Sequence, residues 1–253
     1  EDFQALAERS DKLMKVYEIG ALLHHHLDYP AMVSEIFDPP YLLFYRGNID
    51  AVREPCISVV GTRRPGQGLA QAASAEAGYT LVSGLAFGID AAVHKGALAG
   101  GGKTVAVLPC GADGVVPVSH KGLAATMLEG GGCLLSEYLP GVPAEKFRFP
   151  QRNRIIAALS PVTVVAAAPE KSGALITAEF ALEQGRDVYL LAAGMSDPRC
   201  GGGMGRYRQD GAPVISSVAE YEKYFSAAPG SPDLGGAVCG RHCRQERQLF
   251  FRG

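Results

Sequence analysis

No apolar run in the sequence approaches the roughly 20 residues that a membrane span requires. The first residues also lack the charged and apolar regions of a signal peptide. We therefore expect a soluble, cytoplasmic protein with no membrane partner.

An excess of charge of one sign is also missing. The 24 Lys and Arg residues are balanced by 26 Asp and Glu residues, and the formal net charge is −2. A nucleic-acid site would therefore have to come from local clusters of cations. Hydrophobic residues make up 47% of the 253 residues, which argues against a largely disordered chain and suffices for one large α/β domain.

A complete metal-binding pattern is absent as well. The Cys-Gly-Arg-His-Cys run at 239–243 has no second pair to supply four ligands, and the adjacent histidines 24–26 would point in different directions on a helix. We expect no metal and no cofactor, with these two runs as the less favoured alternatives. Cys56, Cys110 and Cys133 lie in or beside apolar runs, which favours buried, reduced thiols.

Short β-branched runs alternate with helix-like segments from residue 56 onward. The strand candidates are Ile57–Val60, Thr80–Val82, Thr104–Leu108, Cys133–Leu135, Val162–Ala166 and Asp187–Leu191. The helix candidates are Gly68–Ala77, Ala91–Leu98, Gly122–Leu128, Arg154–Ala158 and Leu175–Gln184. This alternation predicts right-handed crossovers and an α/β, extended Rossmann-like fold: a mostly parallel sheet with helices on both faces.

Composition divides the chain into three parts. Residues 1–50 are expected to form a partial helical lead and a Pro-interrupted connector. Residues 51–225 would form the Rossmann-like domain. Residues 226–253 are Gly/Pro-rich and then basic, and we expect a flexible tail there.

The first predicted strand runs into a Gly-rich turn that carries Gly61, Thr62, Arg63 and Arg64. Such a turn presents backbone N–H groups and the positive end of a helix to an anion. The glycines do not have the G-x-G-x-x-G spacing of dinucleotide sites, and no acidic residue ends the second strand. We therefore favour a phosphate site, with a purely structural turn as the alternative.

The second predicted strand ends in the run Ser83-Gly84-Leu85-Ala86-Phe87-Gly88-Ile89-Asp90. Its small residues would let the backbone approach a ligand closely. Asp90 and His94 are four residues apart and could form a catalytic pair. A helix cap at Asp90 and a hydrogen-bonded His94 are the favoured interpretation.

Two further basic segments lie beside predicted strands. Residues 147–154 interleave Arg148, Arg152, Asn153 and Arg154 with two phenylalanines, which combines cations for phosphates with aromatic faces for bases. Residues 170–179 place Lys171, Ser172 and Gly173 at another strand-to-helix turn. Because the carboxyl ends of parallel strands share one edge of the sheet, we expect these segments to converge with the first two.

Together, in this order, these segments resemble the DNA-processing protein A family (DprA, also called Smf). The likeness covers roughly residues 27–218, including Ser172–Ala178 and the run Phe-Pro-Gln-Arg-Asn-Arg-Ile-Ile at 149–156. It implies a protein without catalytic activity that binds single-stranded DNA, protects incoming strands in natural transformation and helps to load the RecA recombinase, usually as a homodimer.

The motifs and the resemblance give one candidate DNA-binding set: Gly61, Thr62, Arg63, Arg64, Ser83, Gly84, Phe87, Gly88, Arg152, Asn153, Arg154, Lys171, Ser172 and Gly173. The chain departs from the family's pattern at Phe87, where the family usually has Arg. It departs again at residues 205–208, where Arg206 and Arg208 could add contacts to DNA. The winged-helix domain that many members carry is not in evidence.

Two other functions are weighed against DNA binding. Related Rossmann-like folds resemble nucleotide hydrolases that cleave an N-glycosidic bond, and Asp90 and Glu179 are the acidic residues available at this edge. No paired carboxylates occur at a motif spacing, which disfavours that activity. A pure interaction platform for a recombinase is the second alternative.

Overall fold

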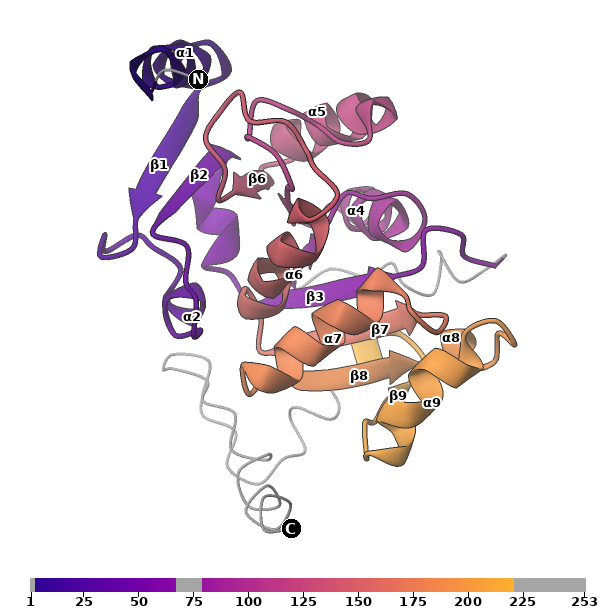
Figure 1. Cartoon of the computed structure of the whole chain (residues 1–253). Coiled ribbons are helices and arrows are strands. Elements are labelled where there is room, and N and C mark those ends of the chain that lie inside the picture. Colours follow the sequence, from indigo (N-terminus) through magenta and orange to yellow (C-terminus); the bar gives the residue numbers. More distant parts are fainter. Residues whose placement is uncertain (1–2, 67–78, 221–253) are drawn as a thin grey trace.

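A single sheet organises the molecule (Figure 1). The computed structural model describes residues 3–66 and 79–220, and in these residues nine strands form one sheet in the order β1-β2-β6-β5-β4-β3-β7-β8-β9. The strands are β1 (Ile19–Leu23), β2 (Leu42–Gly47), β3 (Cys56–Gly61), β4 (Thr80–Ser83), β5 (Thr104–Val107), β6 (Cys133–Ser136), β7 (Val162–Ala167), β8 (Asp187–Leu191) and β9 (Val214–Ile215).

Strands β3 to β8 confirm the six predicted strands. Their Val-, Ile- and Leu-rich runs belong to the centre of the sheet, where both faces are covered, and every residue of β7 is buried. Pairing is parallel from β6 across to β9, whereas β2 runs antiparallel to β6 and to β1. The sheet is therefore mostly parallel, and the fold is Rossmann-like α/β.

The described helices connect and cover these strands. They are α1 (Phe3–Tyr17), α2 (Ala31–Ser34), α4 (Ile89–Ala99), α5 (Lys121–Glu129), α6 (Arg148–Ala158), α7 (Gly173–Glu183), α8 (Ala192–Met195) and α9 (Gly201–Gln209), with short 3₁₀ turns at Ile49–Val52, Val118–His120 and Val218–Glu220. The predicted helices after the second, third, fourth and fifth strands are confirmed as α4, α5, α6 and α7. The one predicted at 68–77 lies outside the described residues.

Helix α6 begins six residues earlier than predicted, at Arg148. Pro150 occupies its first turn, where the backbone N–H has no helical partner and proline is tolerated. The basic segment 148–154 is therefore helical throughout, which fixes the directions of its arginines.

The strand order reverses between β3 and β7. From β3 the chain proceeds through β4, β5 and β6, then returns to the other side of β3 with β7 and β8. Right-handed crossovers place α4 and α5 on one face and the packed pair α6 and α7 on the other, where α7 lies in front of β7 and β8 in Figure 1. The crevice at such a reversal is where open α/β sheets bind ligands.

Two strands of the lead segment were not predicted. β1 and β2 add an antiparallel edge to the sheet beside α1 (Figure 1). The division at residue 50 stays a prediction, and the tail at 226–253 lies outside the described residues. Among the described helices, none has the length and apolarity to cross a membrane.

Candidate nucleic-acid interface

A pocket of about 930 Å³ opens at the reversal of strand order, and we call it the switch-point pocket. Its walls come from the loop after β3, the first turns of α6 and the loop between β7 and α7. Nine of the fourteen candidate residues line it: Gly61, Thr62, Arg63, Arg64, Arg152, Asn153, Lys171, Ser172 and Gly173. All four predicted segments therefore reach one cavity, because Ala86 and Asp90 of the second segment also line it.

Besides Arg199, four exposed cations line this pocket: Arg63, Arg64, Lys146 and Lys171. Within the described part of the chain, none of them forms an ion pair. The Arg63 guanidinium lies over the Phe149 ring, 5.5 Å from its centroid, so a cation and an aromatic face stand together in the pocket. Their charges remain available for an anion.

Arg152 lines the pocket but is almost fully buried, with 4% of its surface exposed. Its Nη1 donates hydrogen bonds to the carbonyl oxygens of Gly84, at 2.8 Å, and of Val107. Burial lowers the pKa of Arg152 to about 10, while the nearby Asp90 carboxylate raises it. Arg152 thus remains charged at neutral pH and joins the loop after β4 to the last residue of β5.

The glycines of the loop after β4 serve contacts within the protein. A Cβ on Gly84 would lie 2.6 Å from the Arg152 guanidinium. Gly88 has a φ of +79°, and a Cβ there would lie 2.4 Å from the carbonyl oxygen of Thr62. These glycines let the loop after β4 close onto Arg152 and onto the loop after β3. Ser83 is buried, and its hydroxyl donates to the Val59 carbonyl oxygen at 2.7 Å.

Asp90 and His94 do not form a catalytic pair. The Asp90 carboxylate accepts the Ala86 N–H at 3.4 Å, and the His94 Nδ1 lies 2.6 Å from the Thr104 hydroxyl. Burial raises the pKa of Asp90, although Arg152 opposes this, and burial lowers the pKa of His94 to about 3. His94 is hydrogen-bonded, as the sequence favoured. The predicted helix cap at Asp90 is wrong, because Asp90 lies inside α4, whose N-cap is Gly88 without a side-chain cap hydrogen bond.

The turn between β7 and α7 is open to the pocket. The Ser172 hydroxyl accepts the Ala174 N–H at 3.3 Å and so caps α7. Gly173 is exposed, and a Cβ there would meet no atom within 4 Å. This leaves room for an anion at the amino end of an 11-residue helix, beside Lys171.

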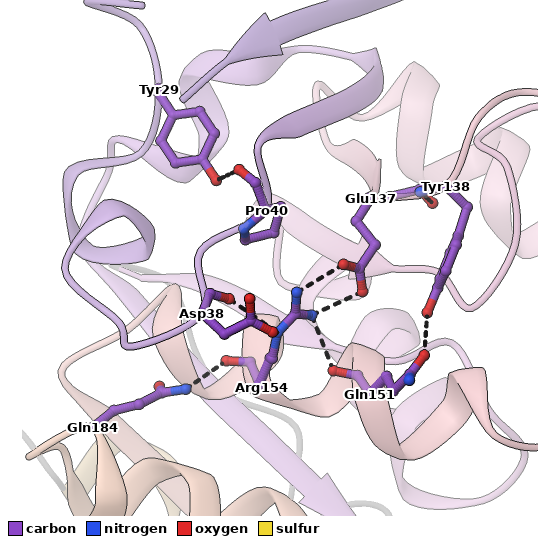
Figure 2. A network of polar contacts seen from close by, with 9 residues as sticks. Tyr29, Asp38, Pro40, Glu137, Tyr138, Gln151, Arg154 and Gln184 are labelled. Carbon is purple, nitrogen blue, oxygen red and sulfur yellow. Dashed lines mark hydrogen bonds and ion pairs between the residues drawn. The ribbon is translucent and has the colours of Figure 1, made fainter. Parts of the chain in front are cut away.

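Arg154 lies outside the switch-point pocket, which corrects the prediction that all the arginines converge. Figure 2 shows its guanidinium between Asp38 and Glu137, with Nη1 and Nη2 at 2.8 and 2.7 Å from the two Glu137 carboxylate oxygens. It lines a separate pocket of about 520 Å³. Residues two apart on a helix point about 200° from each other, so Arg152 and Arg154 cannot serve the same pocket.

Phe87 also lies outside the pocket lining and is half exposed, on the loop that packs against the loop after β3. At residues 205–208, where the chain departs from the family's pattern, Tyr207 is buried and its hydroxyl donates to the Leu175 carbonyl oxygen at 3.1 Å. Arg206 and Arg208 are exposed on α9 and do not line the pocket.

Sequence reasoning missed two cations of the pocket. Lys146 directly precedes the basic segment 147–154 and could have been included with it. Arg199 had no such signal, and its charge is offset by an ion pair with Asp197 at 2.6 Å. Glu170 and Asp90 are the acidic residues of the lining, whereas Glu179 is not part of it.

The cysteines and histidines give no metal site in residues 3–66 and 79–220. Cys56, Cys110, Cys133 and Cys200 are buried free thiols, as predicted for the first three. The run at 239–243 lies outside the described residues.

Comparison with known proteins identifies one family. The family described as DNA recombination-mediator protein A matches residues 20–226. DNA processing protein DprA of Streptococcus pneumoniae is 42% identical over 207 residues, which cover 77% of this chain and 71% of that protein. The X-ray structure of that organism's DprA superposes with a TM-score of 0.78 at 37% identity, covering 88% of this chain and 78% of that chain.

Two other relatives extend this comparison. Protein Smf of Synechocystis is 43% identical over 175 residues, which cover 65% of this chain but 44% of that protein. The chain thus spans less than half of that relative. A structure that describes the single-stranded DNA binding mode of DNA processing protein A from Helicobacter pylori superposes with a TM-score of 0.72 at 25% identity, covering 83% of this chain and 96% of that chain.

Proposed function

This chain belongs to the DNA recombination-mediator protein A family, and from that premise we propose that it binds single-stranded DNA in the switch-point pocket. The observation that carries the proposal is the group of four exposed, unpaired cations of the described chain, Arg63, Arg64, Lys146 and Lys171, around one cavity. The binding mode described for the Helicobacter pylori relative supports a single strand as the ligand.

The four cations would contact backbone phosphates, which carry no sequence information. The Phe149 ring, which lines the pocket beside Arg63, would receive a base, because aromatic rings stack on every base. The open turn at Gly173 would add backbone N–H groups to a phosphate. Binding would therefore be tolerant of sequence and would weaken with salt.

Arg152 and Asn153 would act by positioning the loops. Arg152 fixes the loop after β4 against the end of β5, and Asn153 donates to the Gly173 carbonyl oxygen at 3.2 Å. A site whose walls are already in place loses less entropy on binding. In this proposal Arg154, Ser83, Gly84 and Gly88 shape the protein and do not contact DNA.

We extend the proposal to the cellular role that the family implies: protection of incoming strands and loading of RecA by a cytoplasmic homodimer during natural transformation. Binding, without a chemical step, is the activity proposed. The acidic residues of the pocket support this, because Asp90 is occupied by the Ala86 N–H and no second carboxylate is paired with it in the described residues. Mixing the protein with RecA and coated single strands, and recording strand exchange, tests the loading step.

Fluorescence anisotropy with labelled oligo-dT and a matched duplex tests the binding step. We expect the parent protein to bind the single strand more tightly than the duplex. Arg63→Glu and Lys171→Glu should each weaken binding at least tenfold, because each reverses a charge that faces the pocket. Lys12→Glu on α1 changes the net charge equally, away from the pocket, and should bind as the parent does. Equal losses in all three variants would refute the pocket as the binding site.

A further inference from the structure

Phe87 and His120 form an exposed aromatic pair outside the switch-point pocket. Their ring centroids are 5.0 Å apart, with the rings in an edge-to-face arrangement. Phe87 is 51% exposed, although a phenylalanine of a folded domain gains free energy by burial. Leu85, two residues earlier, is fully buried, and the Ile89 N–H, two residues later, donates to the Thr62 carbonyl oxygen. The exposed ring thus lies between two residues that are anchored to the rest of the protein.

A hydrogen bond to the backbone fixes the His120 ring. The His120 Nδ1 lies 2.8 Å from the Leu85 carbonyl oxygen, and Val118 of the same turn is exposed. Because Nδ1 donates this bond, the ring cannot turn freely and supports one side of Phe87. About half of Phe87 remains exposed beside this contact.

Phe87 and His120 lie at the same edge of the sheet as the switch-point pocket, beyond Arg63. Lys171 follows β7, Arg63 follows β3, Phe87 follows β4 and His120 follows β5, and these four strands are consecutive neighbours in the sheet. Neighbouring strands are about 4.8 Å apart. The loop that bears Phe87 also touches the loop that bears Arg63, because Ile89 N–H donates to the Thr62 carbonyl oxygen at 3.1 Å.

We propose that Phe87, positioned by His120, is a second stacking platform for a base of a single strand that leaves the switch-point pocket past Arg63. The inference rests on the proposed function and deepens it, since it assigns the path of the strand from β7 toward β5. An aromatic residue at this place supplies stacking without a charge. The platform therefore adds affinity for bases and leaves the number of neutralised phosphates unchanged.

The absence of tryptophan from the sequence makes the test direct. Phe87→Trp introduces a unique fluorophore, which oligo-dT should quench on binding while an abasic oligonucleotide of equal length quenches it little. Phe37→Trp is the matched control, because Phe37 is fully exposed beside the separate pocket that Arg154 lines. We expect its emission to stay constant when oligo-dT is added.

Affinities complete the test. Phe87→Ala and Phe87→Leu should each weaken binding of oligo-dT about fivefold or more, while Phe87→Trp retains it, and the slope of affinity against salt should stay that of the parent. Leucine preserves apolar surface but lacks a π face, so parental affinity in Phe87→Leu would indicate apolar docking and overturn the stacking platform. Thermal unfolding of each variant checks that the fold is retained.

The two proposals fail in different ways. Parent protein that binds no oligo-dT would refute the proposed function and the platform with it. Parental affinity in Phe87→Ala together with an unquenched Phe87→Trp would refute the platform alone and leave the switch-point pocket standing. A quench that abasic oligonucleotides reproduce would also contradict base stacking at Phe87.

Discussion

Arg152 and Arg154 lie two positions apart on α6, have different neighbours and stabilise different parts of the protein. Arg152 is buried against the carbonyl oxygens of Gly84 and Val107, whereas Arg154 is held by Glu137 and Asp38. Neither guanidinium is free for a phosphate in the way that the exposed Arg63 is. Among residues of one type, the exposure of the charge decides which of them can bind an anion.

Replacement of the buried Arg152 should lower the free energy of unfolding more than replacement of the exposed Arg63. Arg152→Ala leaves buried carbonyl oxygens without donors and the Asp90 carboxyl without its neighbouring cation, which should lower the free energy of unfolding by about 3 kcal/mol. Arg63→Ala removes an exposed side chain and should change it by less than about 0.5 kcal/mol. Urea unfolding of both variants measures this difference, and equal values would contradict the buried role of Arg152.

His94 should make the fold sensitive to acid. Burial lowers the pKa of His94 from 6.5 to about 3 in the folded protein. Between these two pH values His94 is therefore protonated in the unfolded chain and neutral in the folded one. The neutral His94 therefore contributes its full stabilisation above pH 6.5. As the pH falls from 6.5 toward 3, the free energy of unfolding decreases by up to about 1.4 kcal/mol per pH unit.

His94→Asn tests this linkage, because the amide can still reach Thr104 but does not titrate. We expect the variant's free energy of unfolding to fall less steeply than the parent's over that pH range in urea titrations. The carboxylates titrate in both proteins and cancel from the comparison. Parallel curves would show that His94 does not carry the effect.

At the scale of elements, α6 is the central connector of the molecule. Its Arg154 joins the loop after β6, through Glu137, to the segment before β2, through Asp38, and Gln184 at the end of α7 donates to the Arg154 carbonyl oxygen at 3.0 Å (Figure 2). The same helix presents Phe149 and Asn153 to the switch-point pocket. The antiparallel edge and the pocket are thus both positioned by one helix.

Loss of the Arg154 network should weaken the fold and spare DNA binding. The guanidinium and the Glu137 carboxylate are 12% and 17% exposed, so Arg154→Met leaves a largely buried carboxylate unpaired and should cost about 2 kcal/mol. The double variant Arg154→Met, Glu137→Met should regain part of this loss. Anisotropy with oligo-dT should give an affinity within about twofold of the parent. A tenfold loss would place Arg154 in the binding site after all.

The central elements could be predicted from sequence because their signals are local. The buried runs of β3 to β8 and the turns that follow them stand out in the chain. β1 and β2 could not be found so easily. β1 is an edge strand and β2 lies beside it; they contain Gly20 and Arg46, and a proline-rich segment separates them. The two-residue β9 is shorter than any pattern that could reveal it.

The site was predictable to the extent that it follows strand ends. Gly61 to Arg64 and Lys171 to Gly173 were found because parallel strands bring their carboxyl ends together. The burial of Arg152 and the ion pair of Arg154 with Glu137 depend on segments that are distant in the sequence, so no local sequence pattern predicts them. Arg199 enters the pocket from a loop with no motif of its own.

At the scale of the whole molecule, a chain of net charge −2 places four cations without an ion pair in its described residues around one crevice. The reversal of strand order between β3 and β7 separates two loops there and opens space that side chains do not fill. A polyanion would be drawn to this edge by local potential, since the overall charge repels it weakly. We propose that Arg63, Arg64, Lys146 and Lys171 bind a single strand through its phosphates.

The dependence of oligo-dT affinity on salt tests that claim most directly. Four phosphates neutralised on a single strand give a slope of log K against log salt of about −2.8. Arg63→Ala should bring it to about −2.1, and Lys12→Ala on α1 should leave it unchanged. A parent slope near −2.8 that becomes shallower in Arg63→Ala but not in Lys12→Ala would support the account. Binding that is insensitive to salt, or a slope that Arg63→Ala leaves unaltered, would contradict it.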